Sequence, residues 1–309
     1  MSLSCYAGVP SLDLFFFLVG YPKCGTTALY DYLGNHPGIF MPGIKEPHYF
    51  TEDFPGAREV EAEEAYQALY RDAEAHQLRG DASASVVHSD VALDRILTRY
   101  PQAKFIVLVR DPVAAVRSFH GELLHNLNED VADFERAWRL QAERAEGRDI
   151  PATCREPRFL QYRQIFDYRE QLPAFFEKVP AEQRRVLVFE EFFADPRGGY
   201  RQVLAFLGLE DDGRTDFGAV NSARRHRFRR LAEIHRKMVD GNGWLYRSLK
   251  GAMSRMGIHP SDILARFNRR PGGKPEISAA FEAELCEHFR PDVETVERLL
   301  GRKLEHWRH

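Results

Sequence analysis

Residues 14–27 constrain the fold of this chain more than any other segment. Residues 14–19 are a continuous apolar run that ends at Gly20, a pattern typical of a central parallel strand buried on both faces. A second glycine, Gly25, follows five positions later, and residues 26–33 then carry apolar side chains at helical spacing. A strand, a tight glycine loop and a helix in this order predict an α/β protein whose first loop can hold an anion.

Two later segments repeat the alternation of helix and strand. Residues 104–109 form an apolar run after a helical stretch that ends near Tyr100, and residues 185–189 form another after an amphipathic stretch at 159–179. Short apolar strands that alternate with helices predict a P-loop-like, three-layer α/β/α fold around a central parallel sheet. The chain ends in two helix candidates, residues 276–289 and residues 292–300.

Length and composition indicate a single globular domain. The 309 residues can bury a large core, and we find no repeat or flexible linker, so we expect one domain with a nucleotide-binding core over about 12–230 and a helical part over about 231–309. The formal net charge of −3 gives no general attraction to nucleic acid or to a membrane surface. The apolar run at 12–20 is too short for a membrane span and lacks the basic flank of a signal peptide.

The four cysteines favour a reducing compartment. They are scattered along the chain, with no Cys-x-x-Cys pair and no histidines at metal-ligand spacing. Neither a zinc site nor a disulfide framework is indicated, and we expect a cytoplasmic protein.

The first loop differs from the loop of nucleotide triphosphatases. That loop ends in Gly-Lys-Ser/Thr, in which the lysine meets the β- and γ-phosphates, but here Thr26 stands in place of the lysine. Lys23 lies inside the loop instead, where it could reach the bridge between a 5′-phosphate and its leaving group. This arrangement suits a nucleotide with a single 5′-phosphate.

The run Pro-Lys-Cys-Gly-Thr-Thr at 22–27 resembles the 5′-phosphosulfate loop of sulfotransferases that use 3′-phosphoadenosine 5′-phosphosulfate (PAPS), above all the carbohydrate, heparan sulfate and bacterial types. The resemblance implies transfer of a sulfuryl group from PAPS to an acceptor, with 3′-phosphoadenosine 5′-phosphate (PAP) as product and no required metal. It also implies that the donor contacts Lys23, Cys24, Gly25, Thr26 and Thr27, with Lys23 serving catalysis as well.

A second segment, residues 107–118, resembles the part of these enzymes that holds the 3′-phosphate of the donor, with Arg110 and Ser118 in the matching positions. An arginine can donate two hydrogen bonds to phosphate oxygens. Alone, the segment would be better explained as the start of a helix with Arg110 solvated, but the loop at Lys23 in the same chain favours the functional interpretation. Arg224 and Arg225 are further candidates for contacts with the nucleotide, although a solvated basic turn is nearly as good an explanation.

The general base is expected in residues 43–50, which resemble the segment that carries a catalytic glutamate in heparan sulfate enzymes. Glu46 is the first choice, because of this resemblance. His48 is the second, because a neutral imidazole is closer to the ideal base at neutral pH. His120 is the third. Lys45 either approaches the sulfuryl group or only neutralises Glu46.

The acceptor is not identified by the sequence. We expect a hydroxyl or amine on a small molecule or a carbohydrate. The segment 81–85 resembles a part of the family that lines the acceptor side, and Asp81 either assists catalysis or caps a turn. Two alternatives remain: a P-loop nucleotide kinase or NTPase, and a PAPS- or PAP-binding protein without catalytic activity.

Overall fold

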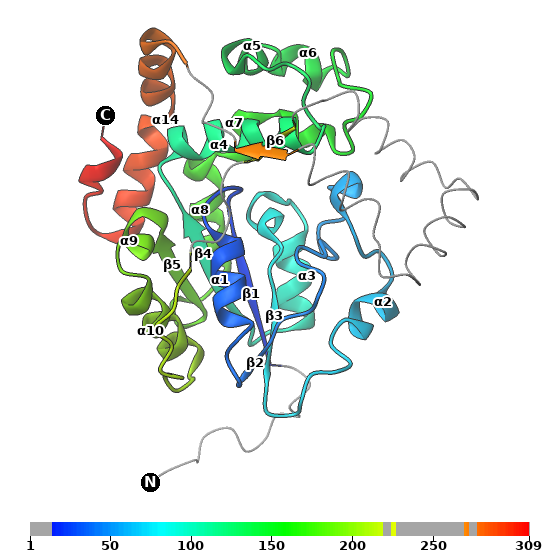
Figure 1. Ribbon diagram of the computed structural model, residues 1–309, viewed down its shortest axis with the longest axis vertical. Helices are drawn as coiled ribbons and strands as arrows, with labels where there is room; N and C mark the ends of the chain where they lie inside the picture. The colour runs from blue at the N-terminus through cyan, green and yellow to red at the C-terminus, as the bar shows by residue number, and fades with distance from the viewer. Residues whose placement is uncertain (1–13, 219–223, 227–268, 272–276, 309) are drawn as a thin grey trace. The chain divides into compact units, whose positions relative to one another are not determined.

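In the described part of the chain, five parallel strands form the central sheet (Figure 1). The computed structural model describes residues 14–218, 224–226, 269–271 and 277–308, with the second and third ranges as backbone. The strand order is β2-β3-β1-β4-β5. The strands are β1 (Phe15–Gly20), β2 (Ile39–Phe40), β3 (Leu78–Asp81), β4 (Lys104–Val109) and β5 (Arg184–Val188). The predicted α/β fold with a parallel sheet is confirmed.

The register of the strands brings their carboxyl ends to one edge of the sheet. Gly20 of β1 pairs with Leu108 of β4, and Val109 of β4 pairs with Val188 of β5. Every residue of β1 is buried, as its uninterrupted apolar sequence predicts. The loops that follow β1, β3, β4 and β5 therefore start beside one another, at the place where parallel sheets bind ligands.

The chain divides into two compact units. The first comprises Met1–Val116, Gln161–Asn221 and Ser278–His309; the second comprises Arg117–Leu160 and Ser222–Ile277. The expected single domain, with a nucleotide-binding core up to about residue 230 and a helical part after it, stays a prediction.

The first unit contains the sheet and its helices. Figure 1 shows α1 in front of the sheet and α3 and α8 behind it, and the latter two both contact the short helix η2. The helices are α1 (Thr26–Leu33), α2 (Glu63–Ala68), α3 (Ala92–Arg99), α7 (Tyr162–Ile165), α8 (Tyr168–Lys178), α9 (Phe189–Ala194), α10 (Pro196–Leu207) and α14 (Ala279–Leu300), with single turns η1 (Pro55–Ala57), η2 (Ala84–His88), η4 (Ala181–Gln183) and η5 (Glu305–Trp307).

The second unit has shorter elements. Helix α4 (Pro112–His125) begins in the first unit and continues into the second. The unit also contains α5 (Phe134–Arg139), α6 (Gln141–Ala145), η3 (Pro157–Leu160) and an antiparallel pair formed by β6 (Arg224–His226) and β7 (Arg269–Pro271). The ion pair between Glu129 and Arg144, 2.6 Å apart and fully buried, links the segment after α4 to α6.

The C-terminal helix corrects one expectation. The sequence predicts two helices separated near Pro291, whereas α14 is one continuous helix through that proline. A proline inside a helix removes one backbone hydrogen bond. The apolar face continues on both sides of it, with Phe289 and Val296 buried, and α14 packs on α8. Burial of that face offsets the lost hydrogen bond.

Candidate functional site

The loop after β1 has the backbone conformation of an anion cradle. Gly25 caps α1 with φ at 94°, and no side chain caps the start of this helix. The N–H groups of Thr26 and Thr27 open the helix, so no earlier helical carbonyl is in place to accept from them. An anion at this position would receive these donors together with the positive end of the helix dipole.

Lys23 lies in the loop with φ at 65°, an unusual value for a residue other than glycine. Such a conformation costs about 1–2 kcal/mol and persists where neighbouring contacts enforce it. The enforcing contact here comes from Arg110, whose Nη1 donates to the carbonyl of Lys23 at 3.0 Å. The two residues expected to hold opposite ends of the donor are thus directly bonded to each other.

Cys24 contributes to this loop through its backbone. Its side chain is fully buried, and burial raises the pKa of its thiol to about 12. The thiol is therefore protonated and unreactive at neutral pH. Its sulfur lies 3.9 Å from the hydroxyl of Tyr168, which donates to the carbonyl of Arg110 at 3.0 Å. Tyr168 thereby braces both the loop and the end of β4.

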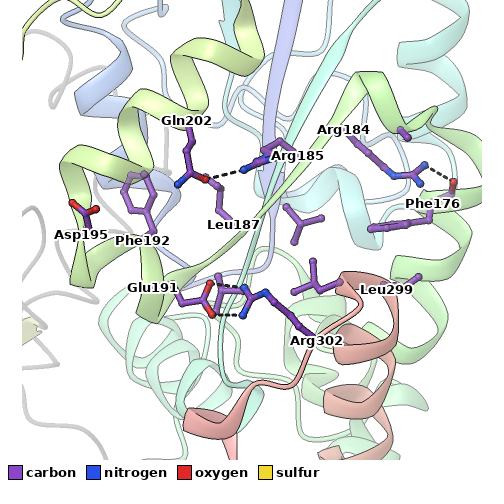
Figure 2. Close-up of a pocket in the computed structure, with 15 residues that line it drawn as sticks. Phe176, Arg184, Arg185, Leu187, Glu191, Phe192, Asp195, Gln202, Leu299 and Arg302 are labelled. Atoms are coloured by element: carbon purple, nitrogen blue, oxygen red, sulfur yellow. Dashed lines mark hydrogen bonds and ion pairs between the residues drawn. The ribbon is translucent and has the colours of Figure 1, made fainter.

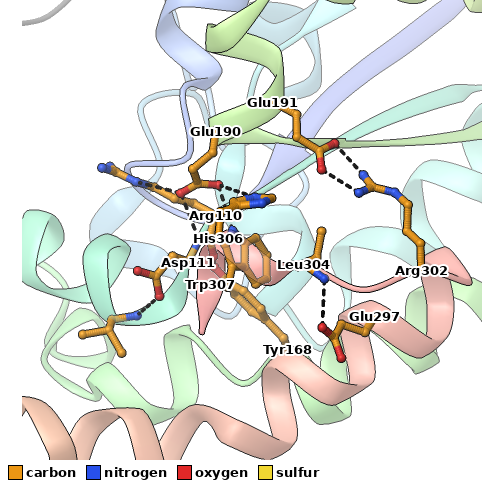
Figure 3. Close-up of polar contacts among 11 residues, drawn as sticks. Arg110, Asp111, Tyr168, Glu190, Glu191, Glu297, Arg302, Leu304, His306 and Trp307 are labelled. Atoms are coloured by element: carbon orange, nitrogen blue, oxygen red, sulfur yellow. Dashed lines mark hydrogen bonds and ion pairs between the residues drawn. The ribbon is translucent and has the colours of Figure 1, made fainter. Parts of the chain in front are cut away.

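Arg110 is held on several sides (Figure 3). Its guanidinium carbon lies 4.2 Å from the centre of the Phe189 ring, and its Nε lies 3.9 Å from Oε1 of Glu190. Its side chain is only 14% exposed. The location of Arg110 at the end of β4 is the one that the sequence predicts, next to the loop of β1.

Three other predicted ligands of the nucleotide stay predictions. Ser118 lies on α4, in the part of this helix that belongs to the second unit. Arg224 and Arg225 lie in β6, and their side chains are outside what the structure describes.

Glu46 and His48, the first and second choices for the base, lie beside each other, and both adopt positive φ angles, 60° and 52°. The His48 Nε2 lies 3.5 Å from Oε2 of Glu46, and its Nδ1 contacts the Ser85 hydroxyl at 2.5 Å. The Ser83 hydroxyl accepts from the backbone N–H of His48 at 3.1 Å. The residues that follow β3 therefore set both the backbone and the ring of His48.

The charge of Glu46 is strongly stabilised. Burial alone would raise the pKa of this carboxyl, but the opposing effects of Lys45 and His48 are together larger and lower the pKa to about 2. The Lys45 ammonium pairs directly with the Glu46 carboxylate. Of the two roles left open for Lys45, neutralisation of Glu46 is the one present in this structure. A carboxylate with so low a pKa is a weak proton acceptor.

Asp81 is a buried anchor. Its Oδ1 accepts from the Ser83 hydroxyl at 2.7 Å, and its Oδ2 accepts from the Tyr66 hydroxyl at 2.8 Å. Burial raises the pKa of its carboxyl, although these two hydrogen bonds oppose the effect. Through Ser83, Asp81 fixes the backbone of His48. The geometry therefore favours a structural role for Asp81.

His120, the third candidate base, has a different environment. Its side chain is fully buried in the second unit, its Nε2 lies 2.9 Å from the carbonyl of Val131, and its ring packs near Phe134. These contacts favour a structural role.

The sequence interpretation missed two residues near Arg110. Glu190, on α9, accepts from the backbone N–H of Asp111 at 3.3 Å and from the indole N–H of Trp307 at 2.9 Å (Figure 3). A tryptophan that is buried needs an acceptor for its N–H, so Trp307 could have been flagged, but its partner is 117 positions away.

A pocket of about 600 Å³ lies along β5, an edge strand of the sheet, and is also lined by residues of α9, α10 and the end of α14 (Figure 2). Among the residues that line it, Arg302 pairs with Glu191 at 2.5 Å, and the Arg185 guanidinium donates to the side-chain oxygen of Gln202 at 2.8 Å. Its lining contains none of the residues predicted to bind the donor. The candidate site is therefore the strand-end region at Lys23 and Arg110.

The described residues contain neither a cluster of metal ligands nor a helix that could span a membrane. Outside residues 1–13, 219–223, 227–268, 272–276 and 309, no three His, Cys, Asp or Glu side chains are grouped to hold a metal ion. Across the same part of the chain, no helix has the length and apolar character needed to cross a bilayer.

Residues 15–223 match the family model described as "Sulfotransferase domain". Carbohydrate sulfotransferase 15 of Mus musculus is 32% identical over an alignment that covers 33% of this chain and 26% of that protein. Heparan sulfate glucosamine 3-O-sulfotransferase 3B1 of Mus musculus is 28% identical, with 62% and 45% covered. The chain thus spans between a quarter and a half of the length of these curated relatives.

A solved structure is similar over nearly the whole chain. The crystal structure of a sulfotransferase from Alicyclobacillus acidocaldarius aligns with a TM-score of 0.70 and 25% identity, and covers 96% of this chain and 98% of that one. The family model covers more than half of this chain, including the Lys23 loop and Arg110. The chain therefore belongs to the sulfotransferase domain family.

Proposed function

We propose that this protein transfers a sulfuryl group from PAPS to a hydroxyl group of a carbohydrate acceptor. The observation that carries the proposal is the hydrogen bond that joins the two halves of the donor site, from the Arg110 guanidinium to the Lys23 carbonyl. An anion cradle at one end and an arginine at the other match a nucleotide with phosphates at both its 5′ and 3′ positions. Ser118, Arg224 and Arg225 are proposed as further contacts to this nucleotide.

The transfer is an in-line displacement. The acceptor oxygen forms a bond to sulfur while the bond from sulfur to the 5′-phosphate oxygen breaks, and PAP leaves with that electron pair. Lys23 and the N–H groups of Thr26 and Thr27 would stabilise the charge that grows on the leaving phosphate. By analogy with phosphoryl transfer, positioning and charge stabilisation supply most of the catalysis.

Glu46 is proposed to accept the proton of the acceptor hydroxyl, with His48 as the second candidate. As long as Lys45 pairs with Glu46, the carboxylate is a weak base. If Lys45 moves to the sulfuryl oxygens when both substrates are bound, the pKa of Glu46 rises toward the range useful for general base catalysis. In this mechanism Lys45 first neutralises Glu46 and then approaches the sulfuryl group, so it serves both of the roles considered for it.

The carbohydrate acceptor is supported by the relatives and by the base. The two curated relatives are named for carbohydrate and heparan sulfate substrates, and the segment with Glu46 and His48 resembles that branch of the family. An amine acceptor is the alternative within the same chemistry.

A transfer assay tests this function. PAP release from PAPS would be measured with heparan sulfate, with a small phenol and without acceptor, for the wild type, Glu46→Gln and His48→Ala. We expect release that depends on the carbohydrate, and its loss in Glu46→Gln with unchanged PAP affinity. Full transfer in both variants would refute the base assignment, and PAP release with the phenol alone would refute the acceptor class.

A kinase or NTPase is not favoured. The family match and Thr26 in place of the triphosphatase lysine both argue against it. A cytoplasmic location is proposed on the evidence of the cysteines, since Cys24, Cys154 and Cys286 are free thiols. Cell fractionation with an antibody to the full-length protein would test it.

A further inference from the structure

Residues 301–308, which follow α14, return to the carboxyl end of β5 and the start of α9. After α14, the segment 301–308 turns back and lies against α9 (Figure 3). We propose that Trp307 and Glu190 form a positioning unit that orients Arg110 toward the 3′-phosphate of the donor. The inference rests on the proposed function, because it assigns the residues that prepare one end of that donor site.

Glu190 is fixed by donors on both of its oxygens. Oε1 accepts from the backbone N–H of Asp111 at 3.3 Å, and Oε2 accepts from the indole N–H of Trp307 at 2.9 Å. The His306 Nε2 lies a further 3.9 Å from Oε2. A carboxylate bound at both oxygens presents its charge at one place, 3.9 Å from Nε of Arg110.

The segment that carries Trp307 is itself anchored through other contacts. Arg302 forms two hydrogen bonds with Glu191, at 2.6 and 2.5 Å. Glu297, near the end of α14, accepts from the backbone N–H of Leu304 at 2.8 Å and pairs with Arg308 at 3.1 Å. The side chain of Trp307 is buried, with 3% of its surface exposed. Trp307 therefore reaches Glu190 from a segment that stays docked without that one hydrogen bond.

The surroundings of Arg110 indicate which of its donors remain for a ligand. Phe189 covers one face of the guanidinium, and Nη1 already donates to the carbonyl of Lys23. Nε is buried, and within the described residues it has no hydrogen-bond partner and faces Glu190 at ion-pair distance. Glu190 thus holds the guanidinium from the Nε side and leaves its outer N–H groups for an anion.

A held arginine loses less conformational entropy when it binds phosphate. Ordering one long side chain at a binding site weakens affinity by about two- to tenfold. Loss of the Trp307 hydrogen bond leaves Glu190 with the longer hydrogen bond from the backbone N–H of Asp111, so that its carboxylate holds Arg110 less firmly. The loss of affinity should therefore come from the 3′-phosphate contact, and the 5′-phosphate contacts at Lys23 should stay unchanged.

Two nucleotides distinguish the contribution of the 3′-phosphate contacts from that of the 5′-phosphate contacts. Adenosine 5′-monophosphate differs from PAP only by the missing 3′-phosphate, so the ratio of the two affinities measures what the 3′-phosphate contributes. We would determine both dissociation constants by calorimetry for the wild type, Trp307→Phe and Glu190→Gln. Phenylalanine keeps an aromatic ring and removes the N–H; glutamine keeps the shape of Glu190 and removes its charge.

Two control variants accompany them. Arg302→Gln removes another polar link of the same segment, to Glu191 rather than to Glu190. Trp138→Phe removes an equally buried indole from the second unit. Both controls should keep the wild-type ratio. A ratio in Arg302→Gln as low as in Trp307→Phe would mean that docking of the segment is responsible, and the inference would be wrong.

The expected result is a two- to tenfold weaker PAP affinity in Trp307→Phe and Glu190→Gln with an unchanged affinity for adenosine 5′-monophosphate, on the order set by one freed side chain. A wild-type ratio in both variants would overturn the inference and leave the proposed function standing. Equal binding of the two nucleotides by the wild type would refute the donor site itself, and the inference with it.

Discussion

Gly25→Ala should damage both the stability of the protein and its nucleotide site. Gly25 has φ at 94°, where a residue with a Cβ atom costs about 1–2 kcal/mol. The added Cβ would also lie 2.5 Å from Cε2 of Phe193 and 3.1 Å from Cδ2 of Phe189, and overpacking of this kind costs about 1–3 kcal/mol more. We therefore expect a loss of about 2–5 kcal/mol in the free energy of unfolding.

Gly208→Ala is the matched control. Gly208 also has a positive φ, at 83°, at the C-terminal end of α10, but an added Cβ would meet nothing within 4 Å. Its loss should be limited to the backbone term, about 1–2 kcal/mol. Urea denaturation of both variants gives the difference, and PAP titration should show weaker binding in Gly25→Ala alone. Equal losses of stability together with intact PAP binding in Gly25→Ala would refute the reasoning.

Two further predictions concern carboxylates. The pKa of Glu46 is lowered to about 2, so its side chain is ionised at all higher pH values. If Glu46 is the general base, kcat/KM should therefore not decline between about pH 8 and pH 5. A decline of kcat/KM in this range would indicate that an imidazole is the base instead. Asp81→Ala leaves the hydroxyls of Tyr66 and Ser83 without their acceptor, and should lower the free energy of unfolding by about 2–4 kcal/mol. The exposed Asp72→Ala should stay within about 0.5 kcal/mol in the same urea experiment, and an equal effect of both changes would contradict the anchoring role of Asp81.

The parts of the fold that the sequence predicts well are those with a continuous apolar pattern. β1, β4 and β5 each coincide with such a run to within one residue at either end. β3 was not anticipated because Leu78-Arg79-Gly80-Asp81 is short and mostly polar, and its burial comes from its place between β1 and β2. Tertiary contacts, rather than local propensity, determine this strand.

The candidate site divides in the same way. The Lys23 loop and Arg110 were predictable because each combines a strand end with a short motif. The contacts that orient them were not, because they join distant segments: Ser85 with His48, and Trp307 with Glu190. The pairing of Lys45 with Glu46 was one of the two roles open from the sequence, but the contact of His48 with Glu46, which also lowers the pKa of that carboxyl, was not predicted.

Calorimetric titration with PAP, without magnesium, tests the central claim most directly. The wild type should bind PAP, and Lys23→Ala and Arg110→Ala should each bind it about ten- to a hundredfold more weakly, because each loses a charge-assisted contact worth about 1.5–3 kcal/mol. A wild type that ignores PAP but binds ATP with magnesium would contradict the account and point to a kinase.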